Sequence, residues 1–77
     1  MYLIEVTDTF GGEANYCWVK RWTVASKRQA VLQAAAEIRS YGCKRTFADV
    51  CGDDVTIRPP VSKGPAVIAF VSWVDAA

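Results

Sequence analysis

Residues 25–42, ASKRQAVLQAAAEIRSYG, carry the one helical pattern of this 77-residue chain. Ser26, followed three residues later by Gln29, is a capping-box pattern that marks a helix start. Five alanines with Leu, Gln, Glu and Arg favour the helical state, and Gly42 stands where a C′ glycine ends a helix. The spacing predicts one slim apolar stripe, which lets the helix approach a sheet closely: Val31, Ala34, Ala35, Ile38 and Tyr41.

Strand patterns stand on both sides of this helix. Two antiparallel strands, residues 2–8 and 16–24, are expected before it, joined by a turn that contains Gly11-Gly12. Three more are expected after it, over residues 43–51, 54–59 and 66–74, with Gly52 and Asp53 as hairpin residues and a Pro-rich loop at 59–65. The last strand is apolar on both faces. It is therefore predicted to be central in the sheet, or covered on its second face by something beyond this chain.

The order ββαβββ predicts a single α+β domain over residues 1–77. We expect two layers, an antiparallel sheet of four to five strands with the helix packed on one face. One helix cannot cover both faces of such a sheet, so the second face should be open to water or to a partner.

The strand at 16–24 leaves two readings open, because its side chains alternate between faces. If Cys17 and Val19 point inward, the aromatic side chains face solvent or a partner. If the aromatic side chains point inward, Arg21 and Thr23 face outward and the strand is an ordinary one. The aromatic-rich face comprises Tyr16, Trp18, Lys20, Trp22 and Val24.

Catalytic chemistry is not indicated. The chain has no His, which removes the commonest general base and the Ser-His and Cys-His nucleophile pairs. No phosphate-cradling glycine motif occurs, and the acids Asp49, Asp53 and Asp54 fit a solvated hairpin tip better than a metal loop. We expect no enzyme activity, no cofactor and no metal site.

The three cysteines, Cys17, Cys43 and Cys51, do not resemble a disulfide framework. Each is expected to be a small buried hydrophobic residue. No signal peptide and no apolar run long enough to span a membrane is apparent. These features favour the reducing cytoplasm of a host bacterial cell.

Charge is distributed unevenly, although the net charge is +1. Residues 20–45 carry seven basic residues against one acid, whereas the rest carries two against seven. Trp, Tyr and Arg dominate protein–protein hot spots, and aromatics interleaved with cations can also bind nucleic acid. The candidate partner-binding residues are Trp18, Lys20, Arg21, Trp22, Lys44 and Arg45.

Residues 6–21, VTDTFGGEANYCWVKR, together with FVSWV at 70–74, resemble small proteins of bacteriophages and mobile elements. That group includes the anti-CRISPR inhibitors, which are similar in size and often α+β. The resemblance implies a non-catalytic protein that binds and blocks a host protein assembly, such as a CRISPR effector complex. DNA mimicry is not implied, since this chain is not strongly acidic.

These observations predict a phage-encoded protein–protein inhibitor, most sharply an anti-CRISPR protein, with a homodimer possible. The alternative is a small nucleic-acid-binding regulator that uses Lys20, Arg21, Lys44 and Arg45. Salt dependence separates the two, because phosphate contacts weaken steeply with ionic strength. A structural phage component would instead form stable higher assemblies by itself.

Overall fold

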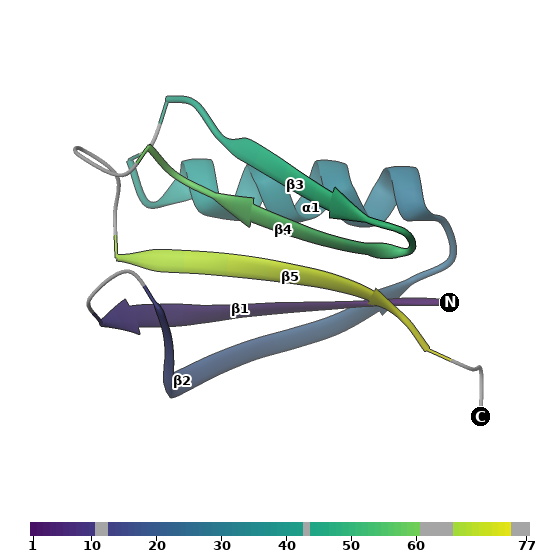
Figure 1. The fold of residues 1–77 in the computed structure, drawn as a ribbon, viewed down its shortest axis with the longest axis horizontal. Helices are drawn as coiled ribbons and strands as arrows, with labels where there is room; N and C mark the ends of the chain where they lie inside the picture. The colour runs from purple at the N-terminus through teal and green to yellow at the C-terminus, as the bar shows by residue number, and fades with distance from the viewer. Residues whose placement is uncertain (11–12, 43, 61–65, 75–77) are drawn as a thin grey trace.

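The computed structural model describes residues 1–10, 13–42, 44–60 and 66–74, and it confirms the predicted α+β order of elements (Figure 1). Two strands, β1 (Tyr2–Phe10) and β2 (Glu13–Val24), precede the helix α1 (Lys27–Ser40). Three strands follow it: β3 (Phe47–Cys51), β4 (Asp54–Arg58) and β5 (Val67–Trp73). All five strands form one antiparallel sheet in the order β2-β1-β5-β4-β3.

The last strand, β5, lies in the centre of this sheet, as its two apolar faces predict. It pairs with β1 from Tyr2↔Trp73 to Asp8↔Val67 and with β4 over Val55, Thr56 and Ile57. The chain therefore joins its first hairpin to its β3–β4 hairpin through its final strand. The edges of the sheet are β2 and β3.

Both ends of α1 are built as the sequence predicts. The Ser26 hydroxyl oxygen accepts a hydrogen bond from the backbone N–H of Gln29 at 3.1 Å. At the other end, Gly42 has a φ of +100°, which a residue without a Cβ adopts at little cost. Its N–H donates to the carbonyl oxygen of Arg39 at 3.0 Å.

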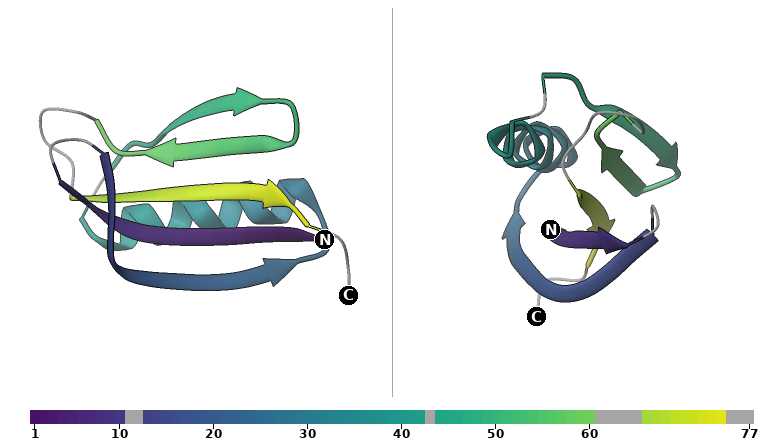
Figure 2. Two further views of the ribbon diagram at one scale, coloured as in Figure 1. Left: turned by 60° about the horizontal axis from the view of Figure 1, so that its bottom comes forward. Right: turned by 90° about the vertical axis from the view of Figure 1, so that its left-hand side faces the viewer.

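The core lies between α1 and one face of the sheet (Figure 2). Ala30 and Ala34 are fully buried, which confirms that small side chains let the helix sit close to the strands. Tyr41 differs from the expectation, because 43% of it is exposed. It is the C-cap residue of α1 and lies beyond Ile38, the last buried residue of the helix. The buried core comprises Ile4, Val6, Ala30, Ala34, Ala35, Ile38, Val55, Ile57, Val67, Ala69 and Val71.

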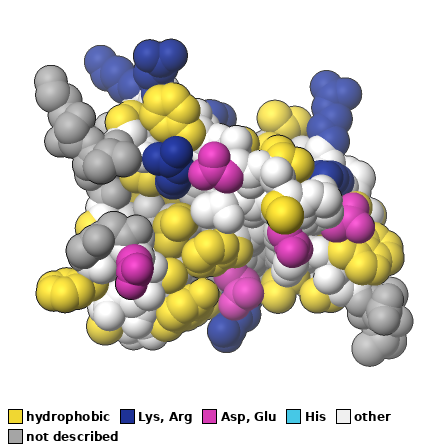
Figure 3. Space-filling model, in the orientation of Figure 1, with side chains coloured by type: hydrophobic (Ala, Val, Ile, Leu, Met, Phe, Trp, Pro, Cys, Tyr) yellow, Lys and Arg dark blue, Asp and Glu magenta, His cyan; other side chains and the backbone are white. Residues whose placement is uncertain are grey.

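The other face of the sheet, here called the open face, has no helix over it in the described part of the chain (Figures 1 and 2). Figure 3 looks onto it and shows hydrophobic side chains gathered over β5, β1 and β2, with charged groups on either side. Four apolar side chains of β1, β2 and β5 on this face are partly exposed rather than buried: Leu3, Val19, Ile68 and Phe70.

Several element boundaries differ from the sequence-based prediction. β1 runs on to Phe10, because its pairing with β2 continues as far as Phe10↔Glu13. β3 starts at Phe47 rather than at residue 43. The predicted glycine turn at 11–12, Cys43 and most of the predicted loop at 59–65 lie outside the described residues. Gly52 and Asp53 form the β3–β4 turn as predicted, with Gly52 at φ +62°.

Candidate functional site

An irregularity in β2 decides where its aromatic side chains point. The pairs Thr7↔Val19 and Thr9↔Ala14 show that β1 advances two residues while β2 advances five. The extra residues of β2 form a bulge in which Tyr16 has a φ of +57°. A bulge of this kind re-aims side chains and strengthens the local twist.

Two side chains of β1 hold the bulge in place. The Asp8 carboxylate accepts hydrogen bonds from the Asn15 side-chain amide and from the backbone N–H of Cys17, each at 2.9 Å. The Thr7 hydroxyl oxygen accepts from the backbone N–H of Tyr16 at 3.0 Å. The hydrogen bond from Asn15 is the largest cause that lowers the pKa of Asp8 below its usual value, and backbone N–H groups of the bulge add to it. A charged Asp8 therefore stabilises the bulge.

Because of the bulge, Tyr16 and Trp18 lie on opposite faces of the sheet. The Tyr16 ring stacks on Phe70 of the open face, with ring centroids 6.4 Å apart. The Trp18 ring lies 6.1 Å from the ring of Tyr41 at the end of α1. Neither sequence-based reading of residues 16–24 is therefore complete, because simple alternation places both rings on one face.

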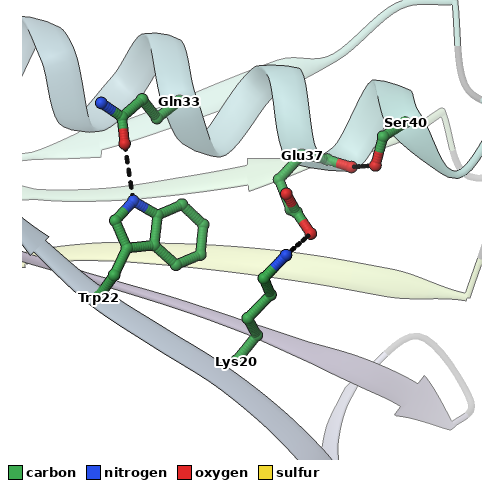
Figure 4. A network of polar contacts seen from close by, with 5 residues as sticks. All are labelled: Lys20, Trp22, Gln33, Glu37 and Ser40. Carbon is green, nitrogen blue, oxygen red and sulfur yellow. Dashed lines mark hydrogen bonds and ion pairs between the residues drawn. The ribbon is translucent and has the colours of Figure 1, made fainter.

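Lys20 and Trp22 face the helix (Figure 4). The Lys20 ammonium group lies 2.8 Å from the Glu37 carboxylate, and the indole N–H of Trp22 donates to the Gln33 side-chain oxygen at 2.7 Å. Gln33 and Glu37 are one helical turn apart on α1. The hydrogen bond with Glu37 raises the pKa of Lys20, and the Glu37 charge adds to this. These two contacts join β2 to α1.

Arg21 projects from the opposite side of β2, onto the open face. Its side chain lies 2.8 Å from the carboxylate of Glu5, its cross-strand partner on β1. A second ion pair lies on the other flank of this face, where Arg58 of β4 meets Asp49 of β3 at 3.0 Å. Both pairs are exposed enough that each adds little to stability.

Lys44 and Arg45 lie between α1 and β3, and both are exposed. Lys44 is three residues beyond Tyr41, so their Cα atoms are at most about 11 Å apart. The six residues singled out from the sequence thus fall into three places. Lys20 and Trp22 join β2 to the helix, and Arg21 lies on the open face. Trp18, Lys44 and Arg45 remain at the end of the molecule where α1 terminates.

Trp18 and Tyr41 form an exposed aromatic pair, of which the sequence predicted only Trp18 as a surface residue. Trp18 is 41% exposed and Tyr41 is 43% exposed. Helical spacing predicts Tyr41 on the buried stripe, whereas the C′ position of Gly42 is the sequence signal that makes Tyr41 the C-cap. We call this pair, together with Lys44 and Arg45, the helix-end surface.

The cysteine prediction is wrong for the two cysteines that the structure describes. Cys17 and Cys51 are both exposed free thiols. Cys17 is exposed because it belongs to the bulge of an edge strand, and Cys51 because it ends the other edge strand. Cys43 lies outside the described residues.

Among residues 1–10, 13–42, 44–60 and 66–74, no group of three or more His, Cys, Asp or Glu side chains is placed to hold a metal ion. No helix in that same part of the chain is long and apolar enough to cross a membrane.

Comparison of the chain with protein-family models, with curated proteins and with solved structures gives no match.

Proposed function

We propose that this chain is a non-catalytic, phage-encoded protein that binds and blocks a host protein assembly, in the sharpest form an inhibitor of a CRISPR effector complex. The observation that carries the binding role is the helix-end surface. Two aromatic rings are held 6.1 Å apart there, each more than two-fifths exposed. Trp, Tyr and Arg are the side chains enriched in the energetically dominant part of protein–protein interfaces.

Blocking, rather than catalysis, is the role that suits a chain without histidine. The resemblance of residues 6–21 and 70–74 to small phage proteins supports the assignment to a CRISPR effector complex. A domain of 8.5 kDa can block a large assembly by direct occlusion of one of its surfaces.

Nucleic-acid binding is less well supported than it is from sequence. Lys20 and Arg21 each lie 2.8 Å from a carboxylate oxygen, so a phosphate would have to compete with a carboxylate that is already bound. They also project from opposite sides of β2, whereas a surface that follows a nucleic-acid backbone needs its cations on one side. Lys44 and Arg45, the other two cations of that hypothesis, are both exposed between α1 and β3.

The test is an interference assay in bacteria that carry one defined CRISPR system each. Cells that express the chain are challenged with a phage that the system targets, and plaques are counted. We expect restored plaquing with at least one system, and loss of that effect in the double variant W18A/Y41A. Leu32→Ala is the matched control, because Leu32 is 57% exposed on α1, away from the helix-end surface.

Binding is measured in parallel with the purified effector complex. Co-elution of the chain with that complex after nuclease treatment is expected, with W18A/Y41A eluting alone. A complex that W18A/Y41A leaves intact would refute the helix-end surface. Co-elution that nuclease treatment or moderate salt abolishes would favour the nucleic-acid-binding regulator.

A further inference from the structure

The open face carries a row of side chains that crosses all five strands. The cross-strand pairs Arg21↔Glu5, Glu5↔Phe70, Phe70↔Thr56 and Thr56↔Asp49 place these residues side by side. From β2 to β3, the row therefore consists of a positive charge, a negative charge, a phenyl ring, a hydroxyl group and a second negative charge. Phe70 is its middle member, because β5 is the third of the five strands.

We propose that a second copy of this chain covers the open face, in a two-fold dimer whose axis runs along the strands near Phe70. The two sheets would then pack face to face, and the two helices would lie outside. This inference concerns a different face from the helix-end surface, and it does not depend on the proposed function.

The first argument is apolar surface. Leu3, Val19, Ile68 and Phe70 are partly exposed on this face, and the ring of Tyr16 lies on Phe70 with more than half of its area exposed. Contiguous apolar side chains at the surface of a soluble protein often mark an interaction site. Two sheets that pack in this way bury their facing side chains in a layer about 10 Å thick.

The second argument is area. The molecule measures 37 × 23 × 21 Å, and the open face is seen along the shortest axis in Figure 3. The rectangle that bounds the molecule in this view is about 850 Å², similar in size to the roughly 800 Å² that each partner buries in an interface of standard size. The open face is therefore large enough for a small interface centred on β5.

The third argument is charge, and it selects the direction of the axis. An axis along the strands reverses the row, so that Arg21 of one copy lies over Asp49 of its mate and Phe70 lies over Phe70. Glu5 of one copy then lies over Thr56 of its mate, which is two residues from Arg58 on β4. An axis across the strands would instead place every charge over its own copy, which is repulsive.

An arginine on each flank of the row can contact the mate, because its side chain is long and its guanidinium has five N–H donors, enough to hold the carboxylate of its own chain as well. Both flanks carry one, Arg21 on β2 and Arg58 on β4.

Pairing through the edge strand β3 is a poorer arrangement for a second copy. β3 is the short edge strand, and Asp49 is its middle residue. Antiparallel pairing of two β3 strands about their centre would set Asp49 directly against Asp49 of the mate. Like charges directly opposite destabilise a strand pair, and a charge on an edge strand is a common guard against such pairing.

The test is the molar mass of the purified chain, measured by sedimentation velocity up to about 1 mM, where even weak dimers are populated. We expect a dimer for the natural sequence and a monomer for Phe70→Arg. Leu32→Arg, a matched change at an exposed apolar residue of α1, should leave the dimer intact. Circular dichroism checks that each variant is folded.

A charge-reversal series tests the axis. R21E sets a carboxylate over Asp49 of the mate, and D49R sets a guanidinium over Arg21, so each should weaken the dimer about tenfold or more. The double variant R21E/D49R restores opposite charges between copies, and its dimer should recover. Within one copy the double variant keeps both repulsive pairs, the new carboxylate beside Glu5 and the new guanidinium beside Arg58. If the substitutions acted only within one chain, the double variant would therefore form the weakest dimer of the three.

A natural sequence that stays monomeric throughout this concentration range would overturn the proposal. A dimer that survives Phe70→Arg would do so too, since another surface would then be responsible. A dimer that the double variant fails to restore would overturn the axis along the strands.

Discussion

Trp22→Ala is the substitution that best separates a core residue from a surface residue on β2. The Trp22 ring is partly buried, packs against the core and pairs across the sheet with Ile4, which is fully buried. Its indole N–H donates to Gln33 of α1. Trp18 is its natural control, because it lies four residues away on the same strand but is 41% exposed.

The magnitude follows from burial. Truncation of a fully buried Trp to Ala costs about 3–5 kcal/mol, and partial exposure of Trp22 reduces this to about 2–3 kcal/mol. The exposed hydrogen bond to Gln33 adds at most about 0.5–1 kcal/mol. A domain of this length is stable by about 4–12 kcal/mol, so Trp22→Ala removes a large share. Trp18→Ala should cost less than Trp22→Ala, because Trp22 packs against the buried core whereas Trp18 is not among the side chains packed on it.

The assay is urea unfolding followed by far-ultraviolet circular dichroism, because loss of a Trp alters fluorescence by itself. All variants are compared at one protein concentration, since any self-association makes stability depend on it. With a slope of about 1 kcal/mol per molar urea, the midpoint should fall by about 2–3 M for Trp22→Ala. A fall for Trp18→Ala that equals or exceeds it would refute the assignment of Trp22 to the core.

Three further perturbations have defined outcomes. Ser26→Ala removes the oxygen that caps α1 through Gln29, and it should lower the free energy of unfolding by about 1 kcal/mol, seen as a melting temperature lower by about 4–8 °C. Gly42→Ala meets no atom within 4 Å of a new Cβ, yet its φ of +100° strains any other residue, so a loss of about 1 kcal/mol in urea unfolding is expected. Asp8 has a lowered pKa in the fold, chiefly through Asn15. Its stabilising effect is thus present above its unfolded pKa and disappears as the pH falls through the lower folded pKa. In an acid titration followed by circular dichroism, Asp8→Asn should unfold with a shallower pH dependence in that range, and an unchanged profile would contradict this role.

Much of the fold follows from short stretches of sequence. The cap at Ser26, the terminating Gly42 and the Gly52-Asp53 turn are all found where the sequence predicts them. Each depends on the conformational preferences of a few neighbouring residues, which do not need the rest of the chain. The central place of β5 was also predictable, because an apolar strand on both faces has few other stable positions.

The candidate sites could not be predicted to the same extent. Alternation along residues 16–24 gives the correct face for Lys20 and Trp22 but the wrong grouping for Tyr16, because the bulge inverts the pattern there. The bulge depends on Asp8, which belongs to another strand. The exposure of Cys17 has the same cause.

The sequence by itself determined the elements, their order and the α+β class, since propensity, caps and periodicity are local properties of the chain. The tertiary structure alone decided which charges are paired and which side chains share a surface. Arg21 and Asp49 are twenty-eight residues apart in the chain, yet β1, β5 and β4 place them at the two ends of one row around Phe70. Such a row arises from strand register, and register is set by packing against α1 rather than by any single stretch of sequence.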